Sequence, residues 1–63
     1  MTHEEAAAWL AEAREEVRAT RDQIRAIMDN GGQVTEAMSQ VLQARIRTMG
    51  AAKQAVRKAE TMR

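Results

Sequence analysis

The sequence predicts an all-α protein, a two-helix antiparallel hairpin that dimerises into a four-helix bundle. Three observations indicate this fold. Proline is absent, and alanine, glutamate and arginine, all good helix formers, dominate the composition. Apolar residues recur in alternating steps of four and three along both halves of the chain. The adjacent glycines Gly31 and Gly32 lie almost at the centre of the 63 residues, where a hairpin must turn.

The first helix is expected over residues 3–29. Thr2 and Glu5 have the spacing of a capping box, in which each side chain accepts a hydrogen bond from the backbone N–H of the other residue. Asn30 and Gly31 are expected to take the left-handed conformation that commonly ends a helix. Both ends of this helix are therefore marked in the sequence.

A second helix of nearly equal length is expected over residues 35–61, after a turn over residues 30–34. Thr35 is the expected N-terminal cap of this helix. At a rise of 1.5 Å per residue, each helix would be about 40 Å long. Residues 1–63 then form a single domain, one helical hairpin.

A seam of residues at heptad spacing is expected to pack the two helices against each other. It comprises Ala6, Leu10, Ala13, Val17, Thr20, Ile24 and Ile27 in the first half and Met38, Leu42, Arg45, Met49, Ala52, Val56 and Ala59 in the second half, flanked by Val34, Val41, Ala55 and Met62. Nine of these residues are the expected interface with a second copy or a partner: Leu10, Ala13, Val17, Ile24, Ile27, Met38, Leu42, Met49 and Val56.

The seam is bulky near the turn and rich in alanine near the chain ends, so a single hairpin should taper. Two hairpins packed antiparallel would set each thick end against the other's thin end, and we therefore expect a homodimer. Ala13 is expected at the level of Gly50, where two small residues would let the backbones approach closely.

Arg45 interrupts the seam, and two interpretations stay open. Its methylene groups could lie along the seam while the guanidinium group reaches water. Alternatively, Arg45 could form a register-setting pair with Glu16, which is expected at about the same height.

Charge is unevenly distributed, although the net charge is only +1. Residues 1–30 hold seven acidic and four basic residues, giving −3, and residues 31–63 hold six basic and two acidic residues, giving +4. Acidic side chains of the first helix should lie beside basic side chains of the second and so fix which helices lie together. These are Glu4, Glu5, Glu12, Glu15 and Glu16 on one side and Lys53, Arg57, Lys58 and Arg63 on the other.

Four arginines follow one side of the first helix at steps of four, three and four: Arg14, Arg18, Arg21 and Arg25. Such a row of guanidinium groups can bind the phosphates of RNA or DNA. The alternative is a solvated helix face, because acidic residues stand three or four positions away and no aromatic residue interleaves the row for base stacking. These acidic residues are Glu15, Asp22 and Asp29.

Trp9 is the only aromatic residue of the chain. It could fill the thin end of the hairpin, or it could anchor a partner, since tryptophan is favoured at interaction hot spots. His3 is expected to be a surface residue of the first turn.

Composition disfavours several classes of function. The chain has no cysteine and a single histidine, so we expect no disulfide, metal or cofactor. No apolar run is long enough to span a bilayer, and the acidic N-terminal stretch lacks the positive region of a signal peptide, so we expect a cytoplasmic protein that enters no membrane. Without tyrosine, a glycine-rich phosphate loop or an enclosed carboxylate pair, we expect neither catalysis nor a small-molecule substrate.

In length, hairpin form and expected dimerisation, the chain resembles the plasmid-encoded RNA-binding four-helix bundle proteins of the Rop type. That resemblance implies RNA binding by a helical face, although the aromatic residue that this family uses there has no counterpart along the arginine row. With its length and the segment GGQVTEAMSQVLQ, the chain is also similar to the small helical-hairpin chaperones of type III secretion.

The sequence thus predicts a non-catalytic helical adaptor, chaperone or inhibitor of the kind found in phage, plasmid and secretion systems. It would bind itself and another protein by laying helix faces against them. The alternative is a Rop-like bundle that binds RNA or DNA through the arginine row.

Overall fold

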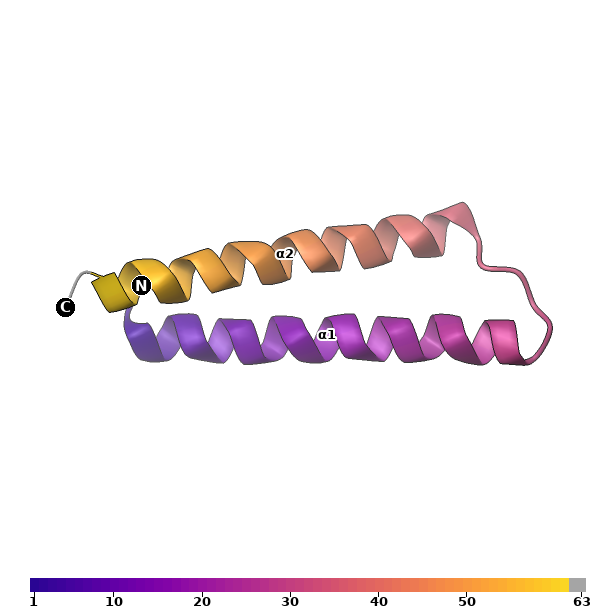
Figure 1. The fold of residues 1–63 in the computed structure, drawn as a ribbon, viewed down its shortest axis with the longest axis horizontal. Helices are drawn as coiled ribbons and strands as arrows, with labels where there is room; N and C mark the ends of the chain where they lie inside the picture. The colour runs from indigo at the N-terminus through magenta and orange to yellow at the C-terminus, as the bar shows by residue number, and fades with distance from the viewer. Residues whose placement is uncertain (62–63) are drawn as a thin grey trace.

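Two helices lying side by side form the protein, and its computed structural model describes residues 1–61. Helix α1 spans His3–Asp29, and helix α2 spans Glu36–Thr61. The chain turns at one end, so the beginning of α1 lies next to the end of α2 (Figure 1). The predicted all-helical class and the packing of two helices in a hairpin are confirmed. Met62, predicted to flank the seam, and Arg63 of the predicted basic stretch lie outside the described residues.

The capping box predicted at the start of α1 is present. The backbone N–H of Glu5 donates to Thr2 Oγ1 at 3.1 Å, and the backbone N–H of Thr2 donates to Glu5 Oε1 at 3.3 Å. Hydrogen bonding with Thr2 lowers the pKa of the Glu5 carboxyl below its ordinary value. The Thr2 side chain has the larger effect and the Thr2 backbone the smaller one. The cap therefore favours the charged form of Glu5, at the end of the helix where the dipole also favours a negative charge.

A Schellman motif ends α1. The Gly31 N–H donates to the Met28 carbonyl at 3.0 Å, and the Gly32 N–H donates to the Ile27 carbonyl at 2.8 Å. Gly31 has φ +77°, whereas Asn30 has φ −90° and ψ 10°. The expectation that Asn30 is also left-handed is wrong, because this motif needs the reversed conformation at one residue only.

Thr35 caps the second helix, as predicted. Its Oγ1 accepts a hydrogen bond from the Met38 N–H at 3.3 Å, and its carbonyl accepts from the Ser39 N–H at 3.1 Å. Thr35 thus satisfies two N–H groups of the first turn of α2, those of Met38 and Ser39.

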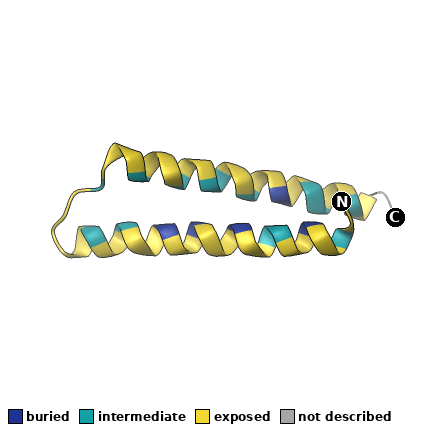
Figure 2. Cartoon of the chain, turned by 180° about the vertical axis from the view of Figure 1, so that it is seen from behind, coloured by how far each residue is buried: buried dark blue, intermediate teal, exposed yellow. Residues whose placement is uncertain are grey.

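The predicted seam lies between the helices. Each of its fourteen members is buried or half-buried, and the buried residues of α1 line the side that faces α2 (Figure 2). The buried residues are Ala6, Ala13, Val17 and Thr20 in α1 and Ala52 in α2. Val41, expected to flank the seam, is 45% exposed. Heptad packing therefore organises the hairpin, although the seam is closed on two sides only.

The hairpin tapers in the predicted direction. The helices lie close together near the chain ends and diverge toward the turn (Figure 1). In the half next to the turn, Ile24, Ile27, Met38 and Leu42 are only half-buried, and Met28 is 60% exposed. Bulky side chains hold the helices apart there and stay partly in contact with water.

Gly50 does not face Ala13. A Cβ built on Gly50 would have nothing within 4 Å, and the residue is exposed. Met49 and Ala52 occupy the seam, so the helical period turns the position between them outward. The predicted close backbone approach at Gly50 is therefore wrong, although Ala13 itself is buried.

Candidate functional site

A chain of hydrogen bonds crosses the middle of the seam. Arg45 Nη1 of α2 donates to Thr20 Oγ1 of α1, and Thr20 Oγ1 donates to the Glu16 carbonyl oxygen at 2.8 Å. Arg45 is half-buried. In the structure its polar partner is Thr20 rather than the Glu16 carboxylate, so Arg45 reaches Glu16 only through the threonine hydroxyl and the backbone.

Two faces of the hairpin flank the seam, and they differ in character. On α1, Arg14 and Arg21 recur seven residues apart on one side of the seam, and Trp9, Glu16 and Gln23 recur at the same interval on the other. A seven-residue interval keeps residues on one side of a helix that packs by heptads. We call these two sides the arginine face and the tryptophan face.

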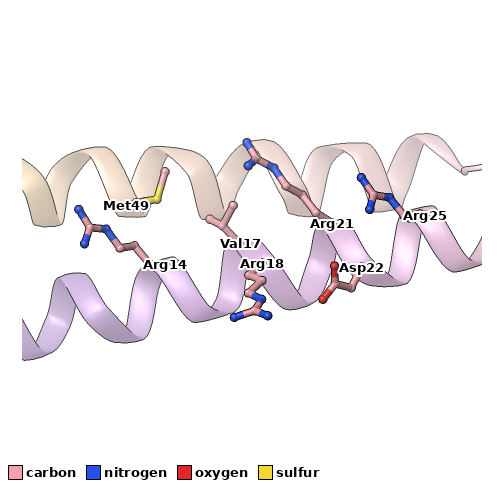
Figure 3. A pocket seen from close by; sticks show the side chains of 7 residues that line it. All are labelled: Arg14, Val17, Arg18, Arg21, Asp22, Arg25 and Met49. Carbon is pink, nitrogen blue, oxygen red and sulfur yellow. The ribbon is translucent and has the colours of Figure 1, made fainter.

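On the arginine face, the four predicted arginines surround one hollow. The hollow measures about 250 Å³ and is lined by Arg14, Arg18, Arg21, Arg25, Val17, Asp22 and Met49. Arg14, Arg21 and Arg25 extend toward α2, whereas Arg18 points away from it (Figure 3). The floor of the hollow includes two apolar seam side chains, Val17 and the half-buried Met49, and the rim of the hollow is cationic. The arrangement suits a partner that combines negative charge with some apolar surface.

The acidic residues that stand near the arginine row in the sequence form no ion pair with it. Among residues 1–61, one contact within 4.0 Å can be an ion pair. His3 Nε2 lies 3.5 Å from Glu60 Oε1, and the contact is ionic when the imidazole is protonated. No described arginine lies within that distance of a carboxylate, and the acidic residues of α1 make no ion pair with Lys53, Arg57 or Lys58. Ion pairing between the two acidic and basic stretches is therefore absent from the described residues, and the guanidinium groups of the arginine face have no carboxylate within 4.0 Å.

On the tryptophan face, two hollows lie in line. The hollow nearer the chain ends has about 200 Å³ and is lined by Trp9, Glu12, Ala13, Glu16 and Thr48. The hollow nearer the turn has about 230 Å³ and is lined by Thr20, Gln23, Ala37, Met38 and Val41. Trp9 is half-buried against the first hollow and keeps part of its ring exposed. Both interpretations of Trp9, as a filler and as an anchor, therefore find support in its position.

Nine residues were predicted to form an oligomer or partner interface. In the hairpin, Ala13 and Val17 are buried, and the seven others are half-buried: Leu10, Ile24, Ile27, Met38, Leu42, Met49 and Val56. The two helices therefore use the seam first against each other, and what the seven residues leave exposed lies along the two faces.

Within residues 1–61 the structure contains no cluster of three or more His, Asp or Glu side chains that could hold a metal ion. Every buried side-chain polar atom of that part of the chain has a hydrogen-bond partner. In the same residues, neither helix combines sufficient length with sufficient apolar character to cross a bilayer.

Three residues that matter for these faces were missed by sequence reasoning. Thr20 was placed in the seam by its spacing, but its role as the acceptor for Arg45 was not foreseen; the signal was a threonine at the height of the seam arginine. Gln23 lines a hollow on the tryptophan face, and the interval of seven from Trp9 through Glu16 marks it. Ile46 is half-buried beside the seam although it breaks the four–three alternation.

In comparisons with known proteins, no protein-family model, no curated protein and no solved structure matches the chain.

Proposed function

We propose that the protein is a non-catalytic helical interaction protein that associates with itself as a four-helix bundle and presents its outer helix faces to a partner. The observation that carries this proposal is the large surface of the single hairpin. The chain exposes 4973 Å², whereas a compact monomer of 7.0 kDa exposes about 4,000 Å². The excess of about 900 Å² is close to the ~800 Å² that each partner contributes to an interface of standard size.

The character of the core supports the same proposal. The hairpin is 50 Å long and only 16 and 12 Å across, and no bulky side chain within residues 1–61 is fully buried. Small chains without disulfides or metals usually need association or very good packing to be stable. A second hairpin would cover the side chains that the turn half of the seam leaves partly exposed.

Sedimentation equilibrium across concentrations from about 1 to 100 μM tests self-association. We expect the mass of a dimer at the upper end and dissociation on dilution, with helicity measured by circular dichroism falling in parallel, since a hairpin that loses its partner should fray. A monomer over the whole range would contradict the proposal. It would direct the search to a different protein that completes the bundle.

A second candidate function, binding of RNA or DNA, is favoured by one specific observation. Four arginines surround one hollow on the arginine face, and within residues 1–61 none of them is paired with a carboxylate. Unpaired guanidinium groups along a helix can bind successive phosphates and release the counterions that surround a nucleic acid.

Titration of a structured RNA and of duplex DNA at several salt concentrations tests this candidate. We expect affinity to fall steeply with salt and to be lost in the Arg18→Glu/Arg21→Glu variant. The matched control is Arg47→Glu/Lys58→Glu, which makes the same change in net charge at exposed positions of α2. Undetectable binding at about 50 mM salt, or equal losses in both variants, would exclude a specific role for the arginine face.

A further inference from the structure

On the tryptophan face, Trp9 and the turn-side hollow lie at matching distances on either side of the middle of the hairpin. Glu16 and Thr48 line the same hollow and so lie at about the same height. Trp9 stands seven residues from Glu16 toward the chain ends, and Gln23 stands seven residues from Glu16 toward the turn. At 1.5 Å per residue, each lies about 10 Å from the middle. Val41, seven residues from Thr48 toward the turn, lines the hollow with Gln23.

From this spacing we infer that a second copy of the chain stacks antiparallel on the tryptophan face, with Trp9 of each copy seated in the hollow of the other that Gln23, Met38 and Val41 line. The inference rests on the proposed self-association and adds which face is used, in which direction, and with which anchor. A two-fold axis perpendicular to the helices, at the height of Glu16 and Thr48, brings Trp9 to the height of Gln23 and Val41. The contact of Trp9 with the turn-side hollow is then made twice, once from each copy, as a two-fold interface requires.

The taper favours the antiparallel direction. The buried residues that let the helices lie close together are small and stand away from the turn, such as Ala6 and Ala52. The half next to the turn is splayed and leaves Val41 45% exposed. An antiparallel copy places its narrow half, which carries the one indole ring of the chain, against the splayed half of its neighbour. A parallel copy would instead stack two splayed halves and leave the two narrow halves apart.

Charge favours the tryptophan face over the arginine face. Stacking two arginine faces would bring two sets of four guanidinium groups together, and like charges across an interface oppose association. On the tryptophan face, the ionisable groups that line the hollows are Glu12 and Glu16, and the antiparallel arrangement brings one like-charged pair together, Glu16 against Glu16 at the axis, in place of two sets of four. The turn-side hollow, which would receive the indole ring, is lined by no ionisable residue.

Substitutions on the two faces test this arrangement by sedimentation equilibrium, with helicity as the check on folding. Trp9→Ala and Val41→Glu should each raise the dimer dissociation constant about 30-fold, the loss typical of a hot-spot residue. Met28→Glu is the matched control, because Met28 is also an exposed apolar residue near the turn but lies outside both hollows of the tryptophan face. It should change the constant by less than about threefold. Trp9, as the sole aromatic residue, also reports directly: its fluorescence should shift to shorter wavelength on association.

A single cysteine tests the direction, because the chain has none of its own. In the antiparallel arrangement Glu16 lies near the axis and faces Glu16 of the other copy, so Glu16→Cys should form a disulfide-linked dimer under mild oxidation. Gly50→Cys, on the exposed side of α2, should remain unlinked. A parallel dimer would place Glu16 against α2 of the other copy and leave Glu16→Cys unlinked as well.

The outcomes separate the inference from the proposal on which it rests. A wild-type dimer that tolerates Trp9→Ala or Val41→Glu, is weakened by Met28→Glu, or leaves Glu16→Cys unlinked overturns the inference while self-association stands. A wild-type chain that stays monomeric overturns both. A dimer weakened by the two tryptophan-face variants alone and linked through Glu16→Cys supports both.

Discussion

Arg45 of α2 donates a hydrogen bond to Thr20 of α1 in the middle of the seam, and this contact joins two residues 25 positions apart in the sequence. Because the threonine hydroxyl donates in turn to the Glu16 carbonyl, its acceptor lone pair is free to receive the guanidinium group. Sliding one helix along the other by a turn, about 5.4 Å, would break the bond. The pair therefore acts as a polar marker of register in an otherwise apolar seam.

A double-mutant cycle measures what this pair contributes. Thr20→Val keeps the shape and removes the acceptor, and we expect it to lower the free energy of unfolding by about 1.5–3 kcal/mol, as for a hydrogen bond to a charged group. In an Arg45→Met background the same change should cost close to nothing, because no donor remains. Urea unfolding followed by circular dichroism, at one fixed protein concentration, provides all four values. Equal costs in both backgrounds would show that the contact contributes no stability.

Gly50 offers a stabilising substitution. It lies inside α2 with open space where a Cβ would be, so Gly50→Ala should raise the free energy of unfolding by about 1 kcal/mol through the lower conformational entropy of the unfolded chain. Ala51→Gly, at the exposed neighbouring position, is the mirror-image control and should lower stability by a similar amount. A loss of stability in Gly50→Ala would mean that this position packs against another chain in solution.

The turn should be sensitive at one glycine in particular. Gly31 has φ +77°, a conformation that costs a residue with a Cβ about 1–2 kcal/mol. Gly31→Ala should therefore lower the unfolding free energy by about that amount, measured by urea titration. Gly31→Asn should be milder, since asparagine tolerates the left-handed region better. Identical stabilities for the alanine and asparagine variants would argue against a left-handed residue at this position.

The cap of α1 should respond to pH. The folded pKa of Glu5 lies below its ordinary value because of hydrogen bonding from Thr2. Because the folded pKa is lowered, the charged Glu5 side chain contributes fully to folding stability above the unfolded pKa, about 4.3 for glutamate. This contribution is lost as the pH falls through the folded pKa. The difference in thermal midpoint between wild type and Glu5→Gln should therefore be largest near pH 7 and shrink below about pH 4.

Glu4→Gln separates capping from charge in that experiment, because it removes one negative charge from the same turn and leaves the capping box intact. Its difference from wild type should be smaller at neutral pH than that of Glu5→Gln. If the two variants followed the same curve, the helix dipole alone would explain the pH response and the hydrogen bonds would contribute nothing to it.

The sequence predicted the two-helix hairpin because the signals for its helices are local. Each helix end is marked by hydrogen bonds within a few residues, at Thr2 and Glu5, at Gly31 and at Thr35. The four–three alternation identifies the face of each helix that packs inward. The errors concern contacts between the helices. Gly50 was paired with Ala13 on height alone, although its angular position on α2 turns it outward. For Arg45, the sequence left open a guanidinium group in water and a pair with Glu16, and neither interpretation named Thr20, whose hydroxyl is the acceptor.

The candidate site was predictable only in part for a related reason. The row of arginines was visible as a spacing, but its relation to Val17 and Met49 depends on how the two helices are packed. The tryptophan face was not visible as a unit, because its residues come from both helices and include glutamine and threonine as well as apolar side chains.

The pairing of His3 with Glu60 across a distance of 3.5 Å has a consequence for connectivity. Since the beginning of α1 and the end of α2 meet, the order of the helices along the chain is not imposed by their packing. A short linker joining the two ends, with a new opening between Gly32 and Gln33, would give a circular permutant in which α2 precedes α1. Both faces would keep their neighbours while the connecting loop moved to the opposite end. The turn end of the molecule, now occupied by the glycines, would then be free to be extended or to be bound.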